Sequence, residues 1–185
     1  TGRPVTISGS RLYDSTTTAS SSILTITSGV SGESLSLTGS GVLGAASAGT
    51  QTITNNNTLA IADGSGGLAS NYTLSGATIN VTIIPRTLNV SLSREYDGTT
   101  SVSGVSLTPT FDSLQGGETL SLSGTGSVSN ANVGSSKAVS LGSIALAAGS
   151  GNPSNYTLNS ATMSITQRVI NLDGIRAYDA STNVL

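Results

Sequence analysis

The sequence of 185 residues contains no histidine and no cysteine, and its only lysine is Lys137. Catalysis by a Ser-His-Asp or Cys-His arrangement is therefore excluded, as are imidazole or thiolate metal sites and disulfide bonds. An isopeptide bond between a lysine and an asparagine could form once at most, so it cannot be a repeated feature. The residue inventory thus disfavours an enzyme.

Charge is also scarce, because seven basic residues face nine acidic ones and the formal net charge is −2. Such a chain has no strong positive field to hold nucleic acid or an anionic membrane surface. No apolar run approaches the roughly 20 residues that span a bilayer, and the first residues do not resemble a signal peptide. We expect no nucleic-acid partner and no membrane insertion, and we interpret the chain as a piece of a longer protein.

Carboxylates and aromatic residues are too few and too scattered to build an obvious site. The six Asp and three Glu form no DxDxD loop of the kind that binds calcium. Glu33 and Glu118 each follow a glycine, and no second carboxylate recurs near them for paired acid–base work. Apart from five tyrosines, Phe111 is the only aromatic residue. We therefore predict no catalytic residue, no metal site and no cofactor.

Small hydroxyl residues are abundant, since 34 Ser and 26 Thr make up about a third of the chain. This composition raises the possibility of a disordered linker. However, 36% of the residues are hydrophobic and the mean hydropathy is +0.13, which disfavours a solvated linker. The chain is expected to fold.

The sequence repeats itself, and the interval is set by Tyr13, Tyr96 and Tyr178, which are 83 and 82 residues apart. Each of these tyrosines precedes an Asp, and arginines stand two and ten residues before it. A Gly-Glu-x-Leu-Ser-Leu-x-Gly segment occurs at 32–39 and 117–124, and Ser-Asn-Tyr-Thr-Leu occurs at 70–74 and 154–158. The residues fixed by these landmarks are Arg11, Tyr13, Asp14, Tyr72, Arg94, Tyr96, Asp97, Tyr156, Arg176, Tyr178 and Asp179.

The landmarks divide the chain into a first module at 1–85, a second at 86–167, and the lead strand of a partial third repeat at 168–185. A module of about 80 residues can hold a modest core of its own. Residues 83–88 leave almost no linker between the first two modules. We expect a stiff, elongated array of adjacent repeats, and a partial third repeat that completes or caps the second module.

Hydrophobic and polar residues alternate along 77–83 and 88–92, which is typical of a half-buried strand. Further short strands are predicted elsewhere, including one at 72–74 and one at 156–158, and clusters of Gly, Asn and Ser predict turns between them. No segment longer than about ten residues has a convincing helical pattern. We predict all-β tandem modules of a small β-sandwich-like, immunoglobulin-like type. A β-grasp-like sheet is the alternative if one helix has escaped recognition.

The Tyr-Asp landmark predicts a strand end followed by a turn. Asp97 can accept hydrogen bonds from backbone N–H groups two or three residues further on. A buried tyrosine whose hydroxyl bonds back to the backbone is a known stabiliser of β-sandwiches. Arg94 would leave the strand on the same face as Tyr96, where it can pair with Asp97. We interpret the landmark residues as structural.

The module pattern resembles the YDG repeats of very large bacterial surface proteins. The resemblance is carried by Tyr-Asp-Gly-Thr-Thr at 96–100, Gly-Glu-Thr-Leu-Ser-Leu-Ser-Gly at 117–124, Asn-Val-Gly at 132–134 and Asn-Tyr-Thr-Leu at 155–158. It covers the whole chain and is closest in the second module; the first has Ser15 in place of the glycine. Such repeats are similar to those of filamentous-haemagglutinin-like adhesins, which Gram-negative bacteria export by a two-partner route.

The resemblance implies an extracellular location at the bacterial cell surface and a role in adhesion or biofilm formation. We therefore expect a non-enzymatic stalk or spacer that presents an adhesive region. The alternative is a binding module that recognises a glycan or exopolysaccharide weakly at each repeat and gains avidity from repetition.

Overall fold

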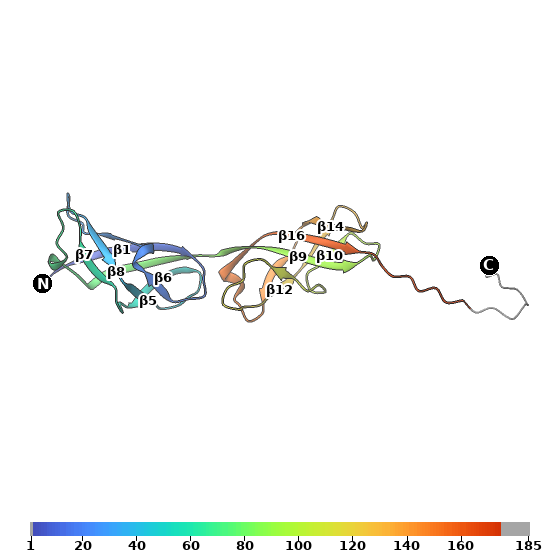
Figure 1. Ribbon diagram of the computed structural model, residues 1–185, viewed down its shortest axis with the longest axis horizontal. Helices are drawn as coiled ribbons and strands as arrows, with labels where there is room; N and C mark the ends of the chain where they lie inside the picture. Colours follow the sequence, from blue (N-terminus) through green and yellow to red (C-terminus); the bar gives the residue numbers. More distant parts are fainter. Residues whose placement is uncertain (1, 175–185) are drawn as a thin grey trace, which may run out of the picture.

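The computed structural model describes residues 2–174 and shows two all-β modules arranged end to end along one long axis (Figure 1). The strands of the first module are β1 (Arg3–Leu12), β2 (Thr18–Ser20), β3 (Leu24–Thr27), β4 (Leu35–Thr38), β5 (Ser40–Leu43), β6 (Gly49–Asn55), β7 (Ala60–Asp63) and β8 (Tyr72–Ile84). Those of the second are β9 (Arg86–Glu95), β10 (Ser101–Ser103), β11 (Thr110–Phe111), β12 (Leu120–Ser123), β13 (Thr125–Val128), β14 (Gly134–Ser140), β15 (Ala145–Ala148) and β16 (Tyr156–Thr166).

The same sheet topology occurs in both modules. The first has a six-stranded sheet in the order β2-β5-β6-β8-β1-β3, and the second has β10-β13-β14-β16-β9-β11. A separate two-stranded sheet accompanies each, β4-β7 in the first and β12-β15 in the second. The first and last strands of each module pair in parallel, β1 with β8 and β9 with β16, whereas the other pairs are antiparallel. Each module is thus closed by its own two ends.

The long strands follow from the alternation in the sequence. In β8 and β9, Val81, Ile83, Leu88, Val90 and Leu92 are buried, and the polar residues between them face outward. The short strand predicted at 72–74 is wrong as a separate element, because it belongs to the 13-residue β8. The pairing of β1 with β8 changes register between Pro4 and Thr6, so β8 continues as one strand where the alternation of its residues is interrupted. The short strand predicted at 156–158 is likewise not a separate element, because it is the beginning of β16.

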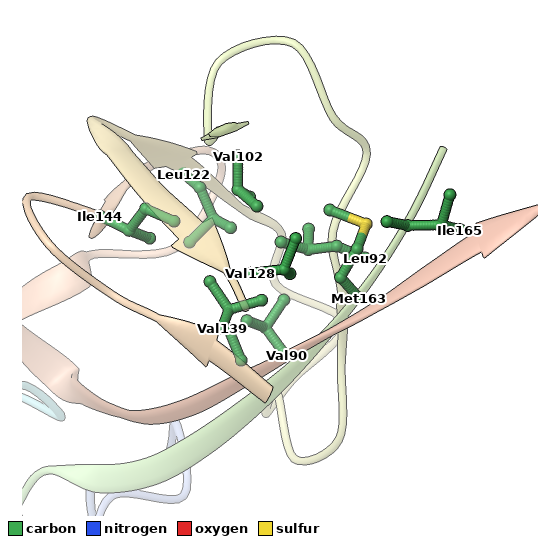
Figure 2. Close-up of a cluster of buried hydrophobic side chains, with 10 residues drawn as sticks. Val90, Leu92, Val102, Leu122, Val128, Val139, Ile144, Met163 and Ile165 are labelled. Atoms are coloured by element: carbon green, nitrogen blue, oxygen red, sulfur yellow. The ribbon is translucent and has the colours of Figure 1, made fainter. Parts of the chain in front are cut away.

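The core of the second module is one cluster of buried side chains, and most of them belong to the six-stranded sheet (Figure 2). Val90 and Leu92 of β9 and Met163 and Ile165 of β16 lie in one cluster with Leu122 of β12. The remaining buried members are Val102, Val128, Val139, Ile144 and Ala161. Full burial of one such large side chain stabilises the fold by about 1.5–3 kcal/mol. The module therefore has a core of its own, as the sequence predicted.

Helical structure in residues 2–174 is limited to three single 3₁₀ turns, at Ser21–Ile23, Ala69–Asn71 and Pro153–Asn155. The prediction of all-β tandem modules is confirmed. The described part of the chain does not contain the helix that the β-grasp-like alternative needs. It also has no helix long and apolar enough to cross a membrane.

Residues 168–174, where we predicted the lead strand of a third repeat, are in no strand, and Val169, Ile170 and Leu172 are exposed. In the two complete modules, this segment pairs with the last strand of the same module. The corresponding strand of a third module would lie beyond residue 185. Arg176, Tyr178 and Asp179 lie outside the described residues.

Candidate functional site

Several hydrogen bonds gather at the contact between the two modules, and this candidate site is formed around Tyr13. Strand β8 ends at Ile84 and β9 begins at Arg86, so Pro85 alone separates them. The backbone N–H of Tyr13 donates to the carbonyl of Ile84 at 2.9 Å, and Nε of Arg86 donates to the carbonyl of Tyr13 at 2.9 Å. The proline ring also fixes its own φ. The first turn of module one is therefore tied to the chain on both sides of the junction.

The ring of Tyr13 is buried against the second module. It is 3% exposed and meets the ring of Tyr156 edge to face, with 5.3 Å between centroids and 77° between planes. This is a favoured arrangement of two aromatic rings. One buried cluster here combines residues of both modules: Tyr13, Ala19, Leu43, Val81 and Ile83 from the first, and Leu88, Leu120 and Tyr156 from the second. The modules share apolar surface that neither would bury alone.

Glu118 joins the two tyrosines. The hydroxyl of Tyr13 donates to Oε1 of Glu118 at 2.5 Å, and the hydroxyl of Tyr156 donates to Oε2 at 2.6 Å. The backbone N–H of Gln115 donates to the hydroxyl of Tyr156 at 3.0 Å. Hydrogen bonds to an ionised carboxylate are stronger than neutral ones. Both oxygens of Glu118 thus hold hydroxyl groups, one from each module.

A further hydrogen bond crosses the junction at Asn155. Its Oδ1 accepts from the backbone N–H of Ala48 at 2.8 Å, and the residue is 4% exposed. Since a buried amide needs partners, this bond favours one fixed placement of the modules.

The environment of the junction changes the acidity of its tyrosines. Burial, followed by the hydrogen bond to Glu118, raises the pKa of Tyr13 from 10.0 to about 12. The same two causes, in the same order, raise the pKa of Tyr156. Both hydroxyls therefore keep their protons, and remain donors, well above neutral pH.

In both described copies of the Tyr-Asp landmark, the arginine and the aspartate form an ion pair at a turn: beside the junction in the first module, and at the outer end of the second. Nη1 of Arg94 binds Oδ2 of Asp97 at 2.9 Å, and the backbone N–H of Thr99 donates to Oδ1 of Asp97 at 2.9 Å. The bond from Thr99 is the largest cause of a lowered pKa at Asp97. Arg11 pairs with Asp14 in the same way in the first module. The turn bond and the ion pair are those expected from the sequence.

The hydroxyl of Tyr13 in the Tyr-Asp landmark does not form the expected internal bond to the backbone, whereas that of Tyr156 accepts one from Gln115. Tyr13 donates across the junction to Glu118 instead, because its side chain leaves the module where the second module begins. Tyr96, at the same repeat position, is 41% exposed. Tyr72 donates to Oε2 of Glu33, its neighbour in the first module. The structure thus brings together Tyr13, Tyr156 and Glu118, and leaves Tyr96 on the outer end.

Sequence reasoning missed the role of Glu118, which was considered only for paired acid–base work. The signal was present, because the Gly-Glu, Asn-Tyr and Tyr-Asp segments recur at nearly the same interval. Residues with one period can meet within a module or between neighbouring modules, and the sequence alone does not distinguish these two arrangements. Among residues 2–174, no group of three or more acidic side chains comes together to hold a metal ion.

Comparison with known protein families gives one match. The family model described as the YDG domain matches residues 1–81 and again residues 80–164. No curated protein and no solved structure matches the sequence. The two matched segments follow the two modules of the fold, and the chain belongs to the YDG domain family, of which it contains two copies.

Proposed function

We propose that this chain is a stalk segment of a large bacterial surface adhesin, of the filamentous-haemagglutinin-like type exported by two-partner secretion. Its YDG modules hold an adhesive region away from the cell for attachment to cells or matrix and for biofilm formation. The segment acts outside the cell, without catalysis, through its length and stiffness.

The observation that carries this proposal is the fixed junction between the modules. A single residue, Pro85, separates β8 from β9, and the Tyr13–Glu118–Tyr156 contact lies directly beside it. A stalk needs each module to hold the next one in a fixed orientation, and this contact fixes the orientation of the two modules. Independent binding modules would instead be served by a flexible linker, which lets each module reach its own ligand.

The surface also supports a spacer. The exposed positions of β9 carry Thr87, Asn89, Ser91, Ser93 and Glu95, and all but Glu95 are neutral hydrogen-bonding groups. Such a surface offers neither a strong field for charged partners nor a large apolar area for aggregation. The first YDG module has the same pattern in β1, where Thr6 and Ser8 are exposed.

A binding experiment separates the stalk from the alternative of a repeated glycan-binding module. The labelled chain of 185 residues, and a tandem chain with twice the number of modules, are tested on a glycan array and on immobilised exopolysaccharides. The stalk proposal predicts background signal for both. Binding that increases with module number would contradict it, because avidity grows with copies of a weak site.

A further inference from the structure

The residues of the junction recur at both ends of the module pair. Tyr96 corresponds to Tyr13, since the backbone N–H of Tyr96 donates to the carbonyl of Thr166 at 2.9 Å just as that of Tyr13 donates to Ile84. The pair formed by Tyr72 and Glu33 corresponds to that formed by Tyr156 and Glu118. The tyrosine and the Glu–Tyr pair meet at the junction in the centre of the chain. At the C-terminal end the tyrosine is present without a Glu–Tyr pair, and at the N-terminal end a Glu–Tyr pair is present without the tyrosine.

The C-terminal face of the second module presents the half that contains Tyr96. Tyr96 is 41% exposed and Val133 is 50% exposed. Val133 corresponds to Ala48, because each precedes the glycine that begins a matching strand: Gly49 pairs with Ile83, and Gly134 pairs with Ile165. At the occupied junction, the N–H of Ala48 is the donor to Asn155.

A surface hollow of about 430 Å³ lies on this face. It is lined by Tyr96, Val133, Gln167, Arg168 and Ile170. Arg168 and Ile170 correspond to Arg86 and Leu88 of the second module, and Leu88 is fully buried in the shared cluster whereas Ile170 is exposed. The hollow on the second module therefore corresponds to the surface of the first module that the second one covers.

The N-terminal face of the first module presents the complementary half, already assembled. Tyr72 donates to Glu33, and this hydrogen bond, followed by burial, raises the pKa of Tyr72. Asn71, the counterpart of Asn155, is exposed. The Glu–Tyr pair thus forms without a neighbour, so it is a preformed acceptor for an incoming tyrosine hydroxyl.

We propose that the face containing Tyr96 and Val133 is a docking surface for the Glu–Tyr face of a third YDG module that continues from Arg168. This rests on the proposed stalk function and names the partner of each module: the next one along the chain. Tyr96 donates to the glutamate of that module, and the N–H of Val133 donates to its asparagine. The continuing chain favours this occupant over a separate molecule, because Arg168, which matches the lead arginine Arg86 in the sequence, already lines the hollow together with Tyr96.

The test extends the chain by one module. Residues 168–185 are replaced by a second copy of residues 86–167, which restores the sequence order of the occupied junction. Backbone hydrogen exchange is measured at Val133 in the 185-residue chain and in the extended chain. We expect exchange about tenfold slower or more in the extended chain, because a buried hydrogen bond must open before exchange. Exchange at Ala48 in both chains is the matched reference.

A substitution separates docking from general stabilisation. In the extended chain, Glu118→Gln is introduced in the added copy alone, so the first junction is untouched. The proposal predicts that part of the protection at Val133 is lost while Ala48 keeps its own. Equal exchange at Val133 in the 185-residue and extended chains would overturn it. That result would not contradict the stalk function, since the contact between the first two modules would be unchanged. Glycan binding would contradict the stalk function but would leave the proposed docking of a third module unaffected.

Discussion

Tyr13 and Tyr96 occupy the same position of the repeat and show what the neighbouring module adds. Both follow an Arg-x pair, precede an Asp, and are bound by their backbone N–H to the last strand of their own module. Only Tyr13 meets a following complete module, and it is 3% exposed against 41% for Tyr96. The difference lies in the partner and not in the local sequence.

Tyr13→Phe removes the hydroxyl that reaches Glu118 and keeps the ring that packs on Tyr156. We expect the free energy of unfolding to fall by about 1.5–3 kcal/mol, which is typical for a hydrogen bond to a charged group. Urea unfolding measures it. Tyr96→Phe is the matched control and should change stability by less than about 0.5 kcal/mol, as exposed substitutions usually do. Equal effects of the two variants would show that the bond to Glu118 contributes nothing.

The tyrosine at the junction also predicts a loss of stability at high pH. Burial first, and then the bond to Glu118, raise the pKa of Tyr13 from 10.0 to about 12. A group whose pKa is raised by folding contributes its full stabilisation below its ordinary pKa, and this is lost as the pH rises through the folded value. The urea midpoint should therefore be steady up to about pH 10 and fall between about pH 10 and 12.

The same titration of Tyr13→Phe attributes this fall to the junction. The variant should lose less stability over that range, and it retains part of the fall because the pKa values of Tyr72 and Tyr156 are also raised. Identical curves for the variant and the parent chain would rule out Tyr13 as a cause.

Whole strands were predictable from the sequence where alternation is long. β8 and β9 contain the patterns at 77–83 and 88–92 and extend beyond both of them. β2 and β10 have three residues each, with a single buried side chain, Ala19 and Val102 respectively. A pattern of one apolar residue among Ser and Thr has no periodicity to detect. These strands exist because the neighbouring strand supplies their hydrogen bonds.

The site itself was less predictable than the strands, because the bond between Tyr13 and Glu118 joins positions 105 residues apart in the sequence. The landmarks identified both residues but not their pairing. Parallel pairing of the first and last strands places these landmarks at opposite ends of a module, and the alternation does not reveal this arrangement. The partner of each landmark therefore emerges only when the modules are placed in space.

The corner between β12 and β13 depends on Gly124. Its φ is +77°, and a Cβ atom there would lie 2.0 Å from the carbonyl oxygen of Ser143. Gly124→Ala should therefore destabilise the chain by about 3 kcal/mol, because left-handed strain adds to a clash with backbone. Gly117→Ala is the control: its φ is +71° with no atom near the added Cβ, so strain alone should cost about 1 kcal/mol. Urea unfolding gives both values, and equal losses would contradict the clash.

The whole molecule is a pair of YDG modules whose long axes continue one another (Figure 1). Three features hold this arrangement: the single residue Pro85 between β8 and β9, the apolar cluster shared by both modules, and the Tyr13–Glu118–Tyr156 contact. Each module has a core of its own, and the junction adds a shared cluster that fixes the direction of one module relative to the other. An array of modules joined in this way gains length without gaining flexibility.

The most direct test of this account is the distribution of distances between the two modules in solution. The chain contains no cysteine, so two substitutions at exposed positions, Thr25→Cys on β3 and Ser127→Cys on β13, introduce the only two thiols that a spin label can modify. Double electron–electron resonance then compares the parent chain with one that has a Gly-Ser linker inserted after Pro85. The account predicts one narrow distribution for the parent chain and a broad one for the linker variant. A broad distribution in the parent chain, equal to that of the linker variant, would contradict it.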